Sequence, residues 1–103
     1  MSKLKLVADP TFNAKVLIPV AGGEPVPVEF TFKHRTRDAI AQWIKDSESQ
    51  TDVQIIKDLA TAWELEDAFT DESIDLLCQN YTGAGFAVVE TYLRELRGAR
   101  RGN

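Results

Sequence analysis

The 103 residues have the length of one domain, with 16 acidic and 12 basic residues and a formal net charge of −4. Hydrophobic residues make up 44% and charged residues 27%, the balance of a globular protein, which argues against a fibrous repeat or full disorder. The single cysteine, Cys78, cannot form an intramolecular disulfide, and no apolar run approaches the roughly 20 residues of a membrane helix. The basic start at 1–5 lacks the apolar core of a signal peptide, so we expect a soluble cytoplasmic domain.

Apolar and polar residues alternate through the first third of the chain, which predicts an antiparallel β-hairpin. The even positions of 12–20 are apolar, and the alternation resumes over 26–32. Between them, the glycine pair at 22–23 can supply the positive φ angles of a tight turn. We also expect a third strand over 3–7, separated from the hairpin by the Asp-Pro break at 9–10.

Beyond residue 33 the apolar spacing changes to that of helices. Thr36 is the expected N-cap of a first helix, and a second helix begins near Thr51 or Asp52. Thr70 caps a third helix, whose first turn is acidic and therefore complements the helix dipole. Gly83 is expected to end this third helix in the left-handed region.

A fourth helix is expected over 84–96, closed by Gly98. Strands followed by helices predict an α+β fold in which about four helices pack on one face of the sheet. We expect a single domain over 1–97 and a flexible tail over 98–103. The residues expected to face the core are, helix by helix, Ala39, Ile40, Trp43 and Ile44; Val53, Ile56, Ala60 and Trp63; Ile74, Leu77, Cys78 and Tyr81; and Phe86, Val89, Leu93 and Leu96.

The residue inventory argues against an enzyme. One histidine, His34, and one cysteine, Cys78, are too few for a zinc site, and a cysteine on a buried helix face acts as a small hydrophobe. The glycines at 83 and 85 precede a helix but follow another helix, with no lysine after them as in a phosphate-binding loop. We therefore predict no catalytic residue, no metal and no cofactor.

Acidic residues are concentrated in one segment, where seven carboxylates lie between Asp58 and Asp75 with no Lys or Arg among them. The segment lacks the glycine and the ligand spacing of an EF-hand loop. It is either a solvated face or a surface for a basic partner, and core packing is the alternative for its two large aromatic residues. The candidate partner-binding residues are Trp63, Leu65, Glu66, Asp67, Phe69, Asp71 and Glu72.

Charge is divided unevenly along the chain. Residues 1–50 carry 7 basic and 6 acidic residues, for a net charge of +1, whereas 51–103 carry 5 and 10, for −5. A dipolar surface of this kind favours protein partners or self-association through charge complementarity. Basic clusters at 33–37 and 94–101 are candidate nucleic-acid contacts, but the acidic balance of the whole chain argues against nucleic-acid binding.

Four segments stand out when they are taken together and in order. They are FTFKHR at 30–35, WELEDAF at 63–69, LCQNYTGA at 77–84 and ETYLREL at 90–96. In this combination the chain resembles, over residues 1–97, a family of tail assembly chaperones from long-tailed bacteriophages and prophages. No single segment is a catalytic signature, so the resemblance depends on the combination.

The resemblance implies a non-enzymatic assembly factor in the host cytoplasm that is absent from the mature virion. Such chaperones bind the tape-measure protein, keep its long apolar helix soluble and recruit tail-tube subunits. Some relatives also exist as a longer frameshifted product, and this chain corresponds to the short form. Self-association along the tape measure would suit an exposed strand edge. The alternative is a small phage or bacterial regulatory or adaptor protein that contacts nucleic acid through its basic junction.

Overall fold

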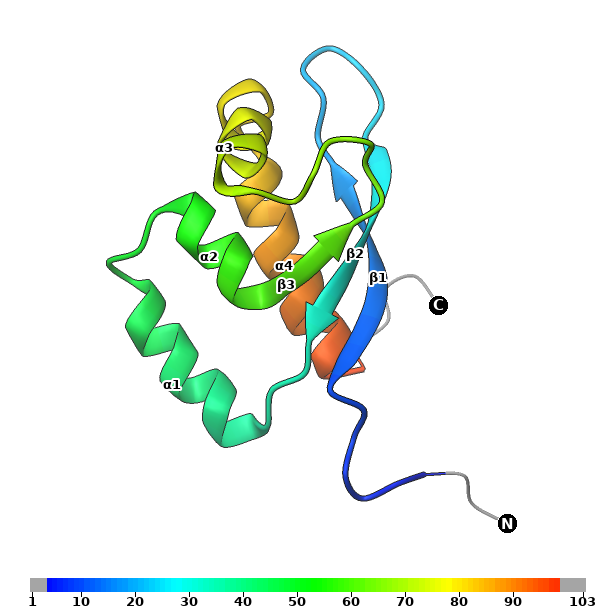
Figure 1. Ribbon diagram of the computed structural model, residues 1–103, viewed down its shortest axis with the longest axis vertical. Helices are drawn as coiled ribbons and strands as arrows, with labels where there is room; N and C mark the ends of the chain where they lie inside the picture. The colour runs from blue at the N-terminus through cyan, green and yellow to red at the C-terminus, as the bar shows by residue number, and fades with distance from the viewer. Residues whose placement is uncertain (1–3, 99–103) are drawn as a thin grey trace.

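The computed structural model describes residues 4–98 and confirms the α+β class, with a sheet covered by helices (Figure 1). The hairpin comes first, as predicted, but a third strand lies between the second and third helices. The strands are β1 (Thr11–Ile18), β2 (Val26–Lys33) and β3 (Ala60–Trp63). The helices are α1 (Arg37–Ser47), α2 (Asp52–Leu59), α3 (Asp71–Asn80) and α4 (Ala84–Leu96).

The predicted hairpin and its turn are confirmed. Strands β1 and β2 pair antiparallel from Thr11 opposite Lys33 to Ile18 opposite Val26. Gly22 has a φ of 73°, and the backbone N–H of Gly23 donates to the carbonyl of Val20 at 3.0 Å, which closes the turn. Because side chains alternate between the faces of a strand, the even positions of both strands face the core and the odd positions of β1 face solvent.

The predicted strand over 3–7 is wrong for the part that the structure describes. Residues 4–7 form no strand, and Leu6 is fully exposed, while residue 3 lies outside the described residues. The third strand is instead β3, which pairs antiparallel with β2 so that Trp63 lies opposite Phe30. The sheet order is therefore β1-β2-β3.

The same strand corrects the second predicted helix face. Ala60 and Trp63 continue the helical spacing of Ile56, but α2 ends at Leu59 and the backbone becomes extended at Ala60, with φ −129° and ψ 158°. Four residues are too few to reveal a strand period. The free edge of β2 supplies the hydrogen-bonding partner that makes them a strand.

The three predicted threonine N-caps are confirmed. The side-chain oxygens of Thr36, Thr51 and Thr70 each accept a hydrogen bond from the backbone N–H three residues further on. Gly98 closes α4 with a φ of 70°, as expected. The prediction that Gly83 ends the third helix is wrong, because α3 ends at Asn80 with Tyr81 as its C-cap, and Gly83 is the N-cap of α4 with a φ of −87°.

The predicted core face of α4 is partly correct, since Val89, Leu93 and Leu96 are half-buried against the core. Phe86, the first residue of the predicted stripe, is 73% exposed, whereas Ala84, Ala87, Val88, Thr91 and Tyr92 are buried. The first turn of α4 lies so close to α2 that a Cβ on Gly85 would come 3.1 Å from Cγ of Asp52. Small residues therefore face inward here and the large Phe86 faces solvent.

In two other helices the predicted core faces are only partly correct. In α1 the structure buries Trp43, while Ile44 remains 40% exposed. In α3 it buries Ile74, while Tyr81 lies just beyond the helix and is 39% exposed. Both helices lie at the periphery of the fold (Figure 1), and each has one buried residue.

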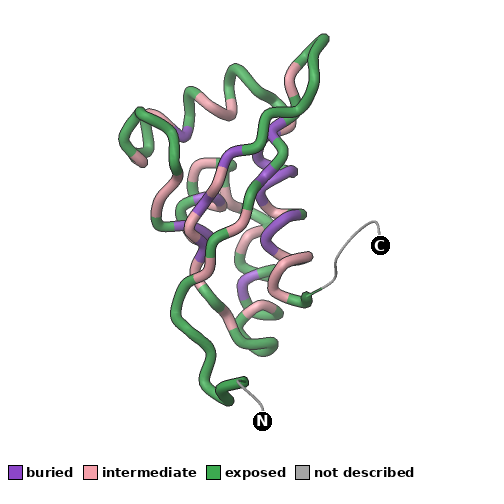
Figure 2. Tube along the Cα trace, turned by 90° about the vertical axis from the view of Figure 1, so that its right-hand side faces the viewer, coloured by how far each residue is buried: buried purple, intermediate pink, exposed green. Residues whose placement is uncertain are grey.

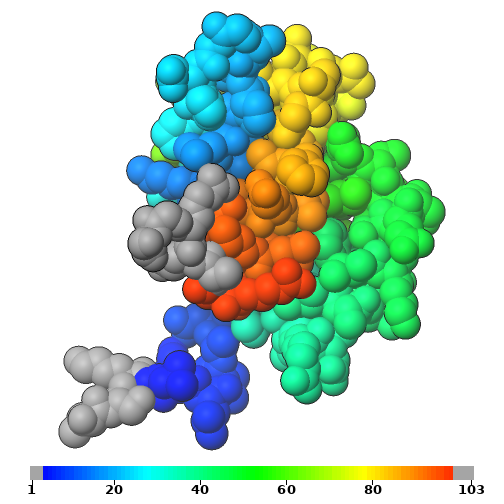
Figure 3. Space-filling model, turned by 180° about the vertical axis from the view of Figure 1, so that it is seen from behind, coloured from blue at the N-terminus to red at the C-terminus, as the bar shows by residue number. Residues whose placement is uncertain are grey.

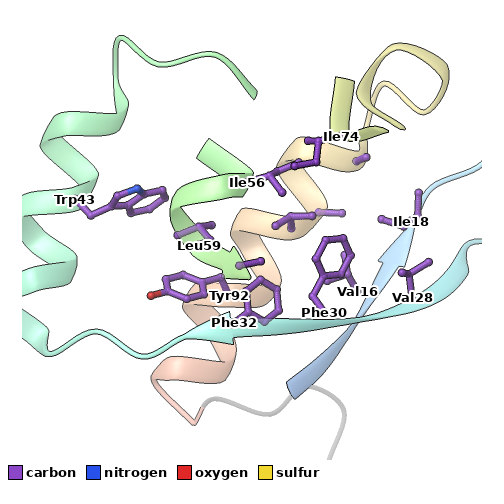
Figure 4. Close-up of a cluster of buried hydrophobic side chains, with 14 residues drawn as sticks. Val16, Ile18, Val28, Phe30, Phe32, Trp43, Ile56, Leu59, Ile74 and Tyr92 are labelled. Atoms are coloured by element: carbon purple, nitrogen blue, oxygen red, sulfur yellow. The ribbon is translucent and has the colours of Figure 1, made fainter. Parts of the chain in front are cut away.

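The core lies between the inner face of the sheet and the helices α2 and α4 (Figure 4). Buried positions follow the strands and the inner side of α4, while the hairpin tip and the N-terminal segment are exposed (Figure 2). No helix among residues 4–98 combines the length and the hydropathy needed to cross a membrane. The fully buried large side chains are Tyr92, Phe30, Phe32, Ile56, Leu59, Ile74, Val16 and Val88.

Candidate functional site: an apolar pocket between the hairpin and α3

An open pocket of about 380 Å³ lies between the tip of the β1–β2 hairpin and α3. We call it the hairpin pocket. The hairpin tip and α3 lie side by side at the same end of the molecule (Figure 3). The lining residues are Ile18, Val20, Val26 and Val28 of the hairpin; Trp63, Leu65 and Asp67 of β3 and the following loop; and Ser73, Leu76, Leu77, Asn80 and Tyr81 at α3.

The pocket presents large apolar side chains to solvent. Val26 is 50% exposed and Leu76 is 63% exposed, and Leu65 and Tyr81 are each exposed by more than a third. Contiguous exposed apolar surface of this kind marks binding sites in proteins. Its lining contains one charged residue, Asp67, and no basic residue.

The structure brings three of the seven predicted partner-binding residues into this pocket: Trp63, Leu65 and Asp67. The Trp63 ring lies edge-on to Phe30 at 5.9 Å and to Phe69 at 5.1 Å. Its Nε1 donates to the backbone carbonyl of Asp67 at 2.7 Å, which fixes the loop that carries Leu65. Trp63 is therefore half-buried, and it both packs against neighbouring aromatic rings and forms part of the pocket wall.

The other four predicted residues lie outside the lining. Phe69 is half-buried and packs against the core, as the alternative interpretation expected. Asp71 is paired with Lys57, with Oδ1 and Nζ 2.6 Å apart. Glu66 and Glu72 are exposed, and neither takes part in an ion pair among residues 4–98. The net effect is an acidic surface in the segment that borders the pocket.

The walls that the hairpin and α3 contribute were not predicted from the sequence. Val26 belongs to the apolar face of β2, but it lies so near the turn that the helices leave it half exposed. Leu76 could have been recognised from the sequence, because it is an apolar residue that lies outside the predicted buried stripe of α3. A large apolar residue on the solvent side of a helix indicates a contact surface.

The histidine and the cysteine lie apart in the described part of the chain. No group of three or more His, Cys, Asp and Glu side chains among residues 4–98 is arranged to hold a metal ion. His34 is exposed and lies at the end of β2, in a different pocket from the one lined by Trp63. Cys78 is half-buried in α3, and burial together with Asp52 and Asp75 raises the pKa of its thiol from 9.0 to about 11.

This pKa predicts an inert thiol. The rise in pKa from 9.0 to about 11 lowers the thiolate fraction of Cys78 about a hundredfold near neutral pH. The thiolate is the reactive form of a cysteine. We expect iodoacetamide to modify the folded chain at pH 8 at least about tenfold more slowly than the same chain unfolded in urea. Mass spectrometry of the two time courses measures this ratio, and equal rates would show that the thiol is neither shielded nor shifted.

Comparison with protein families gives a match over the whole chain. A family model described as "Phage tail assembly chaperone" matches residues 1–103, the whole chain. Searches of curated proteins and of solved structures found no match. The match agrees with the resemblance of the four sequence segments and with an apolar surface that suits a protein partner. The chain therefore belongs to the phage tail assembly chaperone family.

Proposed function

We propose that this chaperone binds the tape-measure protein through the hairpin pocket and helps to recruit tail-tube subunits during tail assembly in the host cytoplasm. The observation that carries the proposal is the pocket itself, in which Val26, Leu65, Leu76 and Tyr81 are held open to solvent. Family membership supports a role in tail assembly, and the resemblance points to a long apolar helix as the bound segment.

The shape and charge of the pocket suit an apolar helix with basic flanking residues. Helices bind to apolar grooves through side chains one turn apart, which enter between the walls. Here the two walls come from the hairpin and from α3, and Asp67 lies in the lining between them. A helix that presents Leu or Ile to the walls and Lys or Arg to Asp67 and Glu66 satisfies both the apolar and the charged surface.

We also propose that copies of the chain associate with each other through the outer edge of β1. Within residues 4–98 this strand pairs with β2 alone, so one side of its backbone has no strand partner. Unpaired strand edges favour pairing with another chain. This arrangement would place several copies, each a domain over 1–97, along one tape-measure helix.

The test is co-expression of the chain with the tape-measure protein of the same phage, followed by co-purification and light scattering. We expect the tape measure to become soluble and to elute with several copies of the wild-type chain. Leu76→Ser in the pocket should weaken retention about tenfold or more, since truncation of an apolar anchor costs at least 1–2 kcal/mol of binding.

Phe86→Ser is the matched control, because Phe86 is 73% exposed on α4, outside the pocket and outside the β1 edge. It should leave retention unchanged, and both variants should keep the stability of the wild type. If the tape measure stays insoluble, tape-measure binding is refuted. If it is solubilised equally by both variants, the pocket is not the binding surface.

A further inference from the structure

A second open pocket, of about 430 Å³, lies at the other end of the molecule, where the C-terminal end of α4 meets the start of α1. We call it the arginine pocket. In Figure 3 the last turn of α4, in red, lies beside the start of α1, far from the hairpin tip and α3. α4 separates the two pockets, since it begins three residues after Tyr81 and ends at Leu96. A helix of this length spans about 20 Å.

The charge of the arginine pocket is opposite to that of the hairpin pocket. Its lining includes His34, Arg35, Arg37 and Arg97, and it contains no Asp or Glu. The Arg37 side chain is almost fully exposed. Its Nε lies 3.9 Å from Oδ1 of the neighbouring Asp38, which is a long distance for an ion pair. His34 and Arg97 are exposed and belong to none of the three ion pairs among residues 4–98.

Arg35 places a fixed positive charge in this pocket. Its Nη1 donates to the Tyr92 hydroxyl at 3.0 Å, and its Nη2 donates to the backbone carbonyl of Asp58 at 2.9 Å. The guanidinium also lies 5.8 Å from the ring centroid of Trp43 and 6.0 Å from that of Tyr92. All of these partners are neutral, and no carboxylate within residues 4–98 forms an ion pair with Arg35. The charge is therefore held in place without being neutralised.

Apolar side chains lie beside these cations. Ile40 and Leu96 are half-buried, and Ile44 is 40% exposed on the side of α1 that the core leaves uncovered. These three apolar side chains, which we call the apolar floor of the pocket, offer no contact to the phosphate groups of a nucleic acid. The net charge of −4 of the whole chain also argues against nucleic-acid binding. An acidic protein segment with an apolar face satisfies both the cations and the floor.

We propose that the arginine pocket binds an acidic amphipathic helix of a protein partner, separately from whatever occupies the hairpin pocket. The proposal depends on the opposite charge of the two pockets and on the unneutralised Arg35, and it holds whether or not the tape measure is the ligand of the hairpin pocket. Because α4 keeps the pockets at opposite ends, one chain can hold a basic and an acidic segment at the same time. This would make the chaperone a bridge between two partners.

The probe is a fluorescein-labelled synthetic helix of about 20 residues, with leucine on one face and glutamate on the other. We expect its fluorescence anisotropy to rise on titration with the wild-type chain at low salt. Arg37→Glu with Arg97→Glu should weaken this binding about tenfold or more. Lys5→Glu with Lys15→Glu changes the net charge equally at exposed positions outside the pocket and should change the affinity less than about twofold.

Three further measurements distinguish this proposal from its competitors. Binding of the same helix with lysine in place of glutamate should not weaken in Arg37→Glu with Arg97→Glu, a short DNA duplex should not displace the acidic helix, and Leu76→Ser in the hairpin pocket should have no effect on the acidic helix. Weaker binding of the lysine helix to that double variant, displacement of the acidic helix by DNA, or equal losses in the two double variants would each overturn the proposal. If Arg37→Glu with Arg97→Glu does not fold, Arg37→Gln with Arg97→Gln should show a smaller loss in the same direction.

Discussion

We expect Tyr92→Ala to lower the free energy of unfolding by about 3–5 kcal/mol, the usual cost of truncating a large buried aromatic residue. Tyr92 is fully buried in α4, and its ring packs on three aromatic side chains from three other parts of the chain. The centroid of the Tyr92 ring lies 6.0 Å from that of Phe12, 5.4 Å from that of Phe32 and 6.2 Å from that of Trp43. Figure 4 shows Tyr92 beside Phe32. Removing the ring therefore removes the aromatic contacts that α4 makes at this position with residues from the β1, β2 and α1 parts of the chain.

Tyr92→Phe isolates the contribution of the hydroxyl. This group donates to the backbone carbonyl of Lys33 at 2.8 Å and accepts from Nη1 of Arg35 at 3.0 Å. Its removal leaves a partly buried carbonyl and a partly buried guanidinium without this partner, for which we expect a loss of about 1–3 kcal/mol. Urea unfolding followed by circular dichroism measures both variants. Tyr81→Phe is the matched control at an exposed tyrosine and should stay within about 0.5 kcal/mol of the wild type.

A cost for Tyr92→Phe no larger than that of Tyr81→Phe would show that the two hydrogen bonds contribute no net stability. A cost for Tyr92→Ala below about 2 kcal/mol would show that the surrounding rings close the cavity. The first result would also weaken the arginine-pocket proposal, since Tyr92 is one of the groups that hold Arg35 in place.

The second large effect is expected at Trp43, the buried residue of α1. We expect Trp43→Ala to cost about 3–5 kcal/mol, because this side chain carries the packing of α1 on Tyr92 and lies against the Arg35 guanidinium. Hydrogen exchange should show that the amides of α1 lose protection before those of α4. The acidic helix should then bind more weakly, since α1 forms one wall of the arginine pocket.

Trp43→Phe should be far milder than Trp43→Ala, with a loss within about 1 kcal/mol. The Nε1 of Trp43 is buried, and none of the described residues accepts a hydrogen bond from it, so phenylalanine removes an unpaired donor while keeping an aromatic ring. Trp63→Phe is the matched control, because Nε1 of Trp63 donates to the carbonyl of Asp67 at 2.7 Å and that bond is lost. If Trp43→Phe costs more than Trp63→Phe, the interpretation of Trp43 as an unpaired donor is wrong.

The uneven distribution of charge along the sequence has a spatial counterpart in the structure. The acidic segment that contains Asp67 borders the hairpin pocket, and the basic junction that contains Arg35 lines the arginine pocket at the other end. Arg97 joins the basic group from the end of α4, where a cation also complements the helix dipole. Two surfaces of opposite charge on one small domain suit an assembly factor that holds two different partners.

Local chemistry made much of the fold predictable from the sequence. The hairpin follows from the period of two over Thr11–Ile18 and Val26–Lys33, with Gly22 at the turn. The helix starts follow from threonine N-caps such as Thr51, which forms a full capping box with Gln54. Each of these features is decided by residues within a few positions of each other, so no knowledge of the distant chain is needed.

The third strand and the buried face of α4 could not be predicted in this way. Ala60–Trp63 has no period of its own and becomes a strand because the edge of β2 offers hydrogen bonds to an extended chain. The orientation of α4 depends on how close α2 and β1 come to it, which brings Ala87 and Val88 inward and leaves Phe86 outside.

The candidate site likewise has features that the sequence determines and features that depend on tertiary packing. By itself, the sequence determined the hairpin, the capped helices, the acidic segment that supplies Trp63, Leu65 and Asp67, and the resemblance to phage tail assembly chaperones. Only the tertiary structure decided that the hairpin tip and α3 meet to form a pocket and that Arg35 gathers with Arg97 at the other end. The physical reason is that caps, turns and periods arise from neighbours in the chain, whereas a pocket arises from packing between segments far apart in it.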